Sequence, residues 1–240
     1  MAVLEALHLT PPIAEALARL GWSADDPLVR DAAPTAARGH NLVLVLPPSP
    51  AAATPALAGM LSRLGPERGA LVLAPAGQLD EWGRVAHALS AGTGLRIQVA
   101  RGTSRATRRL RDDSVDLLIT TPETALALQR RAALRAERVA AVLLAWPEAW
   151  EDEDAVSPLM QDLKDAPRIV ATSEPDRATG LVERYARRAL TLVAGAAEGT
   201  PVGLVRTVTV PWGRRIAALG DLVELLDPAS LVIWTADRGP

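Results

Sequence analysis

The sequence predicts an α/β protein built on a doubly wound parallel sheet. Short runs rich in Val, Ile and Leu alternate with longer amphipathic stretches rich in Ala, Leu and Arg. The apolar runs show no polar alternation, which indicates strands that are buried on both faces, as in parallel sheets. The 240 residues are 49% hydrophobic and 22% charged, so the chain can enclose a substantial core.

The expected elements follow one another in a regular order. A first helix over residues 11–20 has Thr10 as its N-cap, carries proline in its first turn and ends at Gly21. Apolar runs then predict strands at residues 41–46, 70–74, 96–100, 115–120, 139–144, 168–172 and 190–193. Helices are expected between them, at residues 55–64, 77–89, 104–111, 122–135, 155–165 and 176–188.

The chain is expected to divide near its C-terminal end. Residues 1–193 form the predicted main domain, and residues 194–201 (AGAAEGTP) a linker, because this segment is small, glycine-containing and without periodicity. Residues 202–240 then predict a C-terminal βαβ fragment, with strands at 204–210 and 230–235 around a helix at 214–226. Such a fragment cannot bury both faces of its strands alone. It begins a second domain, extends the first sheet or pairs with another chain.

Composition excludes several classes of function. The absence of cysteine excludes disulfide frameworks, Cys-ligated metal centres and thiol catalysis, and the three histidines are too far apart for a helical metal site. No apolar run reaches the ~20 residues of a membrane span, so no membrane partner is expected. The 26 basic residues balance 28 acidic ones, which gives no overall attraction to nucleic acid. Without a leader-like N-terminus, the expected location is cytoplasmic.

Four short motifs follow one another along the chain. Residues 71–75 read LVLAP, and Gln78 follows; Arg101 and Gly102 come after the third strand; residues 120–123 read TTPE, and residues 171–175 read ATSEP. These resemble motif Ia, the GG element, motif Ib and motif III of the DEAD-box helicases of superfamily 2. The resemblance covers roughly residues 8–193. It implies the RecA-like architecture of the P-loop NTPases, as in the first domain of these RNA helicases, and the tail is similar to the start of their second domain.

The phosphate-binding motif departs from the family. Where these helicases have PTGSGKT, residues 48–54 read PSPAAAT. Such a loop works because glycine N–H groups converge on the phosphates and a lysine meets their charge. Here Pro50 lacks an N–H, Ala52 adds a Cβ and Ala53 replaces the lysine. Thr54 keeps the magnesium-ligand position, without the loop that would bring it a ligand.

The catalytic acids depart from the family as well. Its DEAD motif is replaced by residues 145–148, AWPE, so neither the acid that holds magnesium nor the one that polarises the attacking water is present. Glu148 matches only the last acid of the motif, and Arg30 replaces the glutamine that reads adenine. No catalytic residue, metal or cofactor is therefore expected. The degenerate nucleotide site comprises Arg30, Ser49, Pro50, Ala52, Ala53, Thr54, Ala145, Trp146 and Glu148.

Binding of nucleic acid is expected to be weak. Gly77 and Thr124 occupy positions where motifs Ia and Ib carry arginine. The arginines near residue 105 form one basic helix face, although such a run is also typical of a solvated surface. No aromatic residue is interleaved, so any contact with single-stranded RNA would be salt-dependent and blind to sequence. The candidate residues are Pro75, Gly77, Gln78, Arg101, Gly102, Arg105, Arg108, Arg109, Thr120, Thr121 and Pro122.

Tryptophans are frequent for a chain without phenylalanine. Trp146 replaces a catalytic carboxylate, and Trp150 follows four residues later. Two interpretations stay open for this pair: an apolar anchor that binds a partner protein, or packing on the domain's own core. Trp82 is expected to be partly exposed, because Asp80 and Glu81 precede it.

The leading hypothesis is a catalytically inactive, helicase-like pseudo-ATPase domain that acts as a scaffold. Its expected partner is another protein or the remainder of a larger helicase-like chain, with weak contact to single-stranded RNA. The alternative is a divergent ATP-dependent RNA helicase domain that still binds nucleotide and nucleic acid. Only this alternative requires ATP and magnesium.

Overall fold

The structure is a computed structural model in which residues 7–65, 67–151, 155–194, 210 and 212–226 are described. The chain divides into two compact units, Met1–Glu198 and Gly199–Pro240. The expected strand at 230–235 lies outside the described residues. So do residues 204–209 of the expected strand at 204–210, and residues 195–201 of the expected linker.

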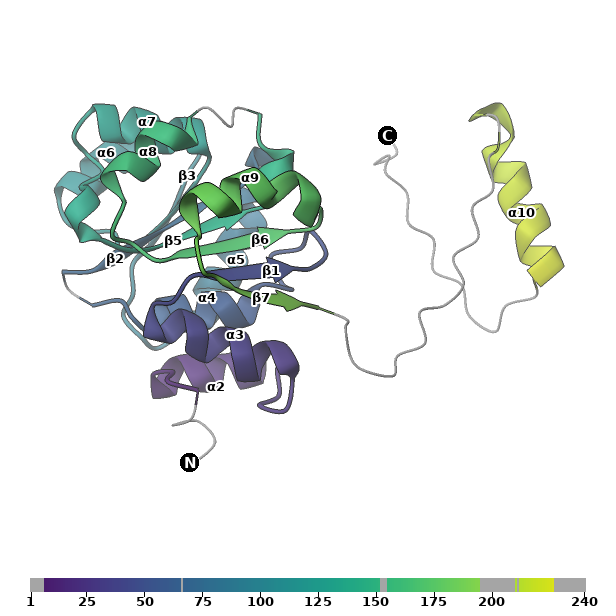
Figure 1. The fold of residues 1–240 in the computed structure, drawn as a ribbon, viewed down its shortest axis with the longest axis horizontal. Helices are drawn as coiled ribbons and strands as arrows, with labels where there is room; N and C mark the ends of the chain where they lie inside the picture. Colours follow the sequence, from purple (N-terminus) through teal and green to yellow (C-terminus); the bar gives the residue numbers. More distant parts are fainter. Residues whose placement is uncertain (1–6, 66, 152–154, 195–209, 211, 227–240) are drawn as a thin grey trace. The chain divides into compact units, whose positions relative to one another are not determined.

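In the described part of the first unit, seven strands form one sheet in which every neighbouring pair is parallel. The order across the sheet is β3-β4-β2-β5-β6-β1-β7 (Figure 1). The predicted doubly wound parallel sheet is thereby confirmed. The strands are β1 (Leu42–Val45), β2 (Gly69–Leu73), β3 (Ile97–Ala100), β4 (Leu117–Thr120), β5 (Val139–Ala145), β6 (Arg168–Thr172) and β7 (Leu190–Val193).

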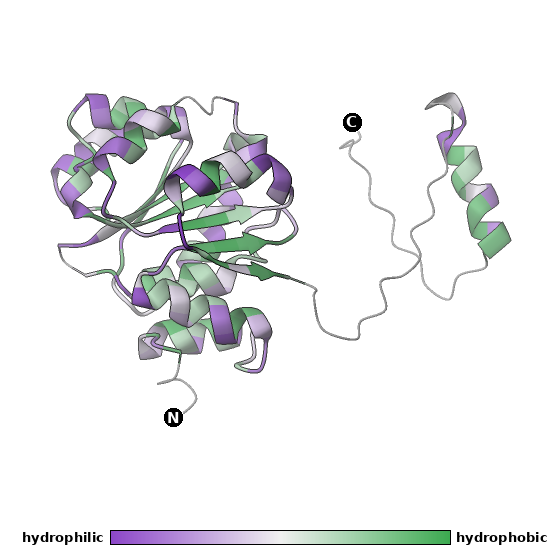
Figure 2. Cartoon of the chain, in the orientation of Figure 1, coloured by the Kyte–Doolittle hydropathy of each residue, from purple (hydrophilic) through white to green (hydrophobic). Residues whose placement is uncertain are grey.

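Helices cover both faces of this sheet and enclose two apolar clusters. Leu42 and Leu44 of β1 face the first cluster, whereas Val43 between them faces the second. Because both faces are buried, the strands read as continuous apolar runs (Figure 2). The first cluster is covered by α2 (Pro11–Arg19), α3 (Pro27–Arg38), α4 (Thr54–Leu61) and α5 (Leu79–Leu89), the second by α6 (Thr103–Arg111), α7 (Pro122–Arg130), α8 (Val156–Asp162) and α9 (Pro175–Tyr185).

Helix α3 is the element that the sequence did not predict. Pro34 lies inside it, and an internal proline normally indicates a break. Two end signals hold the helix: the Asp26 carboxylate accepts from the backbone N–H of Leu28 at 2.8 Å, and Gly39 ends it at φ 78°. A Cβ on Gly59 of α4 would lie 2.1 Å from the carbonyl oxygen of Ala33, so α3 and α4 pack at a distance that requires glycine.

The described residues of the second unit form a 3₁₀ turn (Trp212–Arg214) and helix α10 (Arg215–Leu226), close to the expected helix at 214–226. No residue of α10 is buried, and Ile216 is 89% exposed. This helix therefore presents apolar side chains that its described neighbours do not cover. Among the described residues, no helix is both long and apolar enough to cross a bilayer.

Candidate functional site

The segment at the phosphate-loop position, residues 48–54, folds into consecutive tight turns after β1. The backbone N–H groups of Ala52, Ala53 and Thr54 donate to the carbonyl oxygens three residues earlier, at 2.9, 3.2 and 3.3 Å. Ser49 donates its N–H to Pro47, and Pro50 has none to offer. Most N–H groups that would have to converge on a phosphate are therefore already used within the loop.

The two side chains at the lysine and magnesium-ligand positions of this loop are buried. Thr54 is 2% exposed, and its hydroxyl donates to the carbonyl oxygen of Ala51 at 2.7 Å. Ala53 is fully buried, in the first apolar cluster. The 3₁₀ turn before α5 (Ala76–Gln78) also contacts the loop, because Gln78 Nε2 donates to the carbonyl oxygen of Pro48 at 3.1 Å.

Trp146 is buried in the core at the carboxyl end of β5. It follows Ala145, the last residue of β5, at φ 46°, and its backbone N–H donates to Ala171 on β6 at 2.7 Å. Its ring is fully buried and packs on Trp82 of α5, with ring centroids 5.7 Å apart. Both rings belong to the same apolar cluster as Ala53. In the described part of the chain neither indole N–H has an acceptor.

Trp82 is thus a correction to the expected partial exposure, since it is fully buried. Its polar neighbours misled the prediction, whereas helical spacing would have found it. Leu79, Trp82, Ala86 and Leu89 recur every three to four residues along α5 and all are buried.

Glu148 keeps a structural role at the end of β5. Its carboxylate accepts from Thr172 Oγ1 at 3.0 Å and from the backbone N–H and hydroxyl of Ser173 at 2.6 and 2.8 Å. This carboxylate therefore joins the loop after β5 to the end of β6, where the motif III-like sequence lies. Because three donors engage the Glu148 carboxylate, it links β5 to β6.

Arg30 lies on α3 and is exposed. Its guanidinium donates to the carboxylate of Asp31 at 3.3 and 3.1 Å, and this hydrogen bonding raises the pKa of Arg30 above its usual value. Among the described residues, no hydrogen bond or ion pair joins it to the degenerate loop. Together the collapsed loop, the buried threonine and the missing acids do not fit ATP with magnesium, and the described residues contain no cluster of three acidic or histidine side chains that could hold a metal.

A groove of about 480 Å³ opens on the same edge of the sheet, beside the collapsed loop. It lies where β2, β3 and β4 end, because the carboxyl ends of parallel strands meet there. The candidate nucleic-acid residues Pro75, Gly77, Arg101, Thr121 and Pro122 line it together. The hydroxyl of Thr121 accepts from the Thr124 backbone N–H at 3.3 Å and so caps α7.

The other candidate residues have different surroundings. Gln78 is engaged by Pro48, and Thr120 is buried with its hydroxyl donating to Ala100 at 2.7 Å. Gly102 is the N-cap of α6, on which Arg105 and Arg108 are exposed. Arg109 is half-buried and donates to Gln98 Oε1 at 2.7 Å, so its guanidinium is engaged within the domain.

The charge of the groove does not favour a phosphate backbone. Its one cation, Arg101, is ion-paired with Asp80 on α5. The carboxylates of Glu123 and Glu151 also line it. Gly77 and Thr124, which replace the family's arginines, add no positive charge.

Trp150 lies at the base of the groove and is 8% exposed. Its indole N–H donates to the carbonyl oxygen of Ala145 at 3.0 Å, and its ring belongs to the second apolar cluster. With Trp146 fully buried, neither ring is exposed as an anchor for a partner protein. Of the two interpretations, the structure supports core packing.

The fold has close counterparts among solved structures. A DEAD box protein from the hyperthermophile Methanococcus jannaschii aligns with a TM-score of 0.68 at 15% identity, over 90% of this chain and 61% of that chain. A hypothetical ATP-dependent RNA helicase from Sulfolobus tokodaii aligns at 0.66 and 12% identity, over 78% and 57%. This chain has the fold of a DEAD-box helicase domain.

Dbp5 from S. cerevisiae, in a structure with Gle1 and IP6, aligns at a TM-score of 0.66 and 16% identity, over 79% of this chain and 51% of that chain. The chain thus spans between half and two thirds of the length of these helicases. No protein-family model and no curated protein matches the sequence. At this identity the likeness concerns the helicase fold alone.

Proposed function

We propose that this helicase-like domain neither binds nor hydrolyses ATP and acts as a scaffold. The observation that carries the proposal is the loop at residues 48–54, whose N–H groups are spent on internal turns and whose threonine hydroxyl is buried. A phosphate cradle requires free converging N–H groups and a cation, and both are absent from this loop.

The two acids needed for hydrolysis are missing at the same place. Ala145 and Trp146 offer no oxygen to magnesium or to an attacking water. Glu148 is held by Thr172 and Ser173, so it serves the link between two strands. Losses at three separate segments all disable one site, while the sheet that positions them is complete.

The scaffold role rests on the groove beside the degenerate loop. Its walls combine apolar atoms of Pro75, Ala76 and Ala149 with the carboxylates of Glu123 and Glu151. We infer that it contacts a protein surface, either a separate partner or the remainder of a longer helicase-like chain. Apolar contact with a few polar groups is typical of such interfaces.

Titration with a fluorescent ATP analogue in the presence of magnesium tests the loss of nucleotide binding. We expect no saturation up to about 1 mM analogue, a range in which a functional site of micromolar affinity would be filled. A Thr54→Val variant serves as the matched control, because it removes the only side-chain group left at the magnesium position. Saturable micromolar binding that Thr54→Val abolishes would contradict the proposal and support a divergent ATP-dependent helicase domain.

A second candidate function is weak contact with single-stranded RNA. The favouring observation is that predicted RNA-binding residues from three strand ends converge on one groove, at the N-terminal end of α7. Reversal of the two exposed arginines, Arg105→Glu with Arg108→Glu, should abolish a salt-dependent shift of an RNA oligonucleotide. A shift that is unchanged in this variant would rule out their part in binding.

A further inference from the structure

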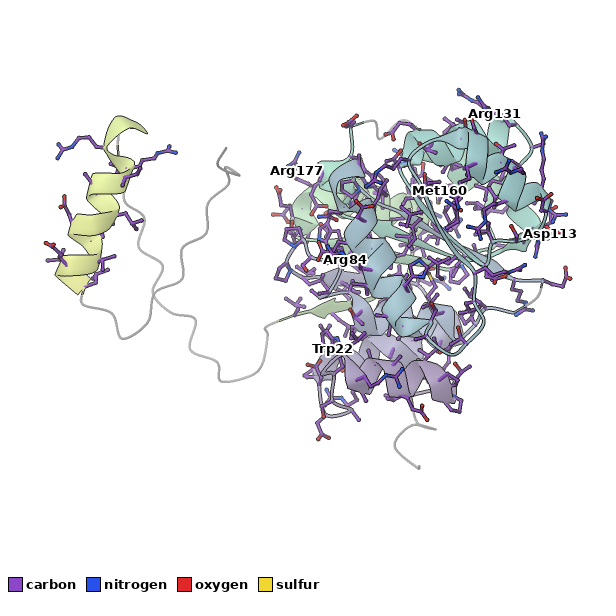
Figure 3. All side chains as sticks on the ribbon, turned by 180° about the vertical axis from the view of Figure 1, so that it is seen from behind. Trp22, Arg84, Asp113, Arg131, Met160 and Arg177 are labelled. Atoms are coloured by element: carbon purple, nitrogen blue, oxygen red, sulfur yellow. The ribbon has the colours of Figure 1, made fainter. Side chains whose placement is uncertain are left out.

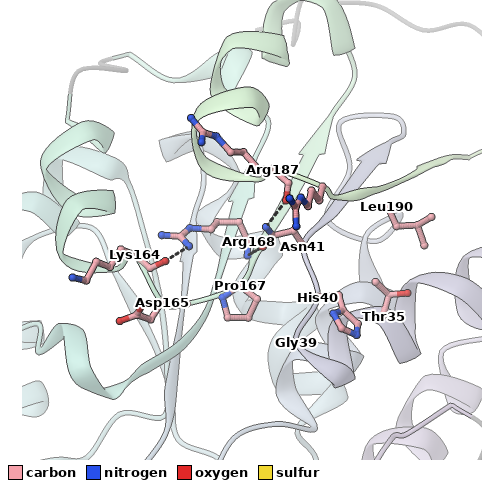
Figure 4. Close-up of a pocket in the computed structure, with 12 residues that line it drawn as sticks. Thr35, Gly39, His40, Asn41, Lys164, Asp165, Pro167, Arg168, Arg187 and Leu190 are labelled. Carbon is pink, nitrogen blue, oxygen red and sulfur yellow. Dashed lines mark hydrogen bonds between the residues drawn. The ribbon is translucent and has the colours of Figure 1, made fainter.

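A second cavity lies at the opposite edge of the sheet from the degenerate ATP loop. It has a volume of about 580 Å³ and is formed by the residues that precede three strands: 39–41 before β1, 164–167 before β6, and 187–188 before β7 (Figure 4). These parallel strands are neighbours in the order β6-β1-β7, so their starts meet at one place. We call it the amino-edge cavity.

The lining of the amino-edge cavity is strongly cationic. Lys164, Arg168, Arg187 and Arg188 contribute positive charges, and Asp165 is the only carboxylate among the lining residues. Lys164 is also the only lysine of the chain. The side chains of Lys164 and Arg188 make no hydrogen bond or ion pair with any described residue, so two of these charges have no internal partner.

Arg168 is the buried member of this group. The residue is 8% exposed and forms no ion pair with a described carboxylate. Its two terminal nitrogens donate to the backbone carbonyl oxygens of Leu163 and Lys164, and its Nε is buried without an acceptor. Burial lowers the pKa of this guanidinium from its usual value. A buried cation with an unmet donor is costly unless a counter-charge reaches it.

Hydrogen bonds between the Asn41 side chain and the backbone fix the positions of Arg168 and Arg187. Asn41 Nδ2 donates to the carbonyl oxygen of Arg187 at 3.0 Å, and Asn41 Oδ1 accepts from the Arg168 backbone N–H at 2.8 Å. One asparagine therefore links the starts of β1, β6 and β7, as Figure 4 shows. Arg188 adopts φ 58°, a left-handed conformation uncommon for arginine. The cavity is thus organised before any ligand arrives.

We propose that the amino-edge cavity binds a small anion that carries phosphate groups. Guanidinium and ammonium groups are the side chains that bind phosphate best, through charge-assisted hydrogen bonds. The volume falls in the range of small-molecule sites, about 300–1,000 Å³. The site is separate from the degenerate ATP loop, which follows β1 at its carboxyl end, and it does not depend on the proposed function.

The test is calorimetric titration of the full chain with pyrophosphate at low ionic strength. We expect one saturable site with a Kd below about 1 mM. Lys164→Gln combined with Arg188→Asn should weaken binding about tenfold or more, because two charge-assisted contacts are lost. Asparagine at residue 188 tolerates the left-handed backbone, and both side chains are exposed, so the variant should fold.

A double variant of equal net charge, Arg130→Gln with Arg177→Gln, is the matched control. Both arginines are exposed and neither lines the cavity; Arg177 lies at the periphery of the domain on α9 (Figure 3). The affinity of this control variant for pyrophosphate should match that of the wild type. Equal weakening in both variants, or no saturation by pyrophosphate, would overturn the proposal.

A second ligand distinguishes a small phosphate-bearing ligand from the phosphates of RNA. A single-stranded RNA oligonucleotide presents the same phosphate groups on a polymer. Pyrophosphate binding that is lost in the cavity variant supports a small ligand. Loss of RNA binding in this variant, with no pyrophosphate binding in the wild type, would instead contradict it.

Discussion

The two edges of the sheet carry opposite kinds of side chains. At the carboxyl edge, the positions that the helicase family gives to lysine and to a catalytic acid hold Ala53 and Trp146, both fully buried in an apolar cluster. At the amino edge, charges remain partly or wholly buried: Arg168 lies against helix-end carbonyls, and Asp116 accepts from Arg96. The domain therefore carries apolar side chains at two carboxyl-edge positions where the helicase motifs have charged ones, and it carries charged side chains at the amino edge.

This contrast has a physical basis. In a doubly wound sheet, helix C-terminal ends gather at the amino edge, and their carbonyl groups favour cations. Arg168 and Arg187 donate to carbonyl oxygens at the ends of α8 and α9. Helix N-terminal ends gather at the carboxyl edge and favour anions, but at α4 the N–H groups are used by the preceding turns. The helix ends therefore meet cations at the amino edge, whereas at the carboxyl edge the N–H groups before α4 are used within turns.

The largest expected effect on stability comes from removing the ring of Trp146, which is buried at the carboxyl edge. Trp146→Ala should lower the free energy of unfolding by about 3–5 kcal/mol, because a fully buried ring leaves a cavity beside Trp82. Urea unfolding measures this loss. Trp22→Ala, at a partly exposed tryptophan, is the control and should cost clearly less. Equal costs for the two variants would show that Trp146 does not fill the site.

The amino edge should show the strongest dependence on pH. Burial raises the pKa of Asp116, but the hydrogen bonds and charge of Arg96 outweigh burial and hold that pKa below its usual value. A depressed pKa means that the carboxylate stabilises the fold fully above about pH 4, and that this stability is lost as the pH falls through the folded value. Asp116→Asn should cost about 1–3 kcal/mol at pH 7.

The same variant should also flatten the fall in stability below pH 4, as followed by urea unfolding at several pH values. Asp176→Asn, at an exposed aspartate on α9, is the control and should leave the pH profile unchanged. If Asp116→Asn keeps the wild-type pH profile, the pair of buried Asp116 and exposed Arg96 does not set the acid sensitivity.

The acid that the carboxyl edge has kept should matter for stability. Glu148→Ala should cost about 1–3 kcal/mol, because it leaves the hydroxyl of Thr172 and the two donors of Ser173 without their acceptor. Glu148→Gln keeps one acceptor oxygen and should cost less. Thermal unfolding of both variants measures the difference. If Glu148→Ala melts as the wild type does, the link between β5 and β6 is dispensable.

The smallest effect on stability is expected from returning arginines to the groove. Gly77→Arg with Thr124→Arg should change the unfolding free energy by no more than about 0.5 kcal/mol, because Gly77 is exposed and a Cβ there meets no atom within 4 Å. Binding of single-stranded RNA should tighten, with a salt dependence steeper by about 0.7 per added phosphate contact.

Thr179→Arg with Gly180→Arg makes the same exchanges on α9, away from the groove, and is the matched control. Electrophoretic shifts over a range of salt concentrations measure both variants. An equal gain in RNA binding for the two would mean that net charge, and not the groove, governs the contact.

The sheet could be predicted from the sequence because burial on both faces leaves a plain signal. Each of the seven strands expected between residues 41 and 193 overlaps an observed one, and the meeting of Pro75, Arg101 and Thr121 in one groove follows from parallel strands ending at a common edge. Helix α3 escaped prediction because Pro34 reads as a break, although here the helix is held by Asp26 and Gly39 at its ends.

Side-chain direction could not be predicted in the same way. Arg109 belongs to a basic run, yet it turns inward to Gln98, which depends on the neighbouring strand β3. Trp150 was equally compatible with a surface anchor until its N–H was placed on Ala145. Both outcomes depend on how an element packs on its neighbours in three dimensions, which periodicity does not encode.

The packing of Trp146 on Trp82 has a consequence for how this domain can change over time. Glutamate at residue 146 alone would leave a hole and bury a charge, and lysine at residue 53 alone would place an ammonium group in an apolar cluster. Each single replacement toward the helicase motifs therefore lowers the stability of this core. Restoring the lysine and the acid of those motifs would require several simultaneous replacements in one apolar cluster.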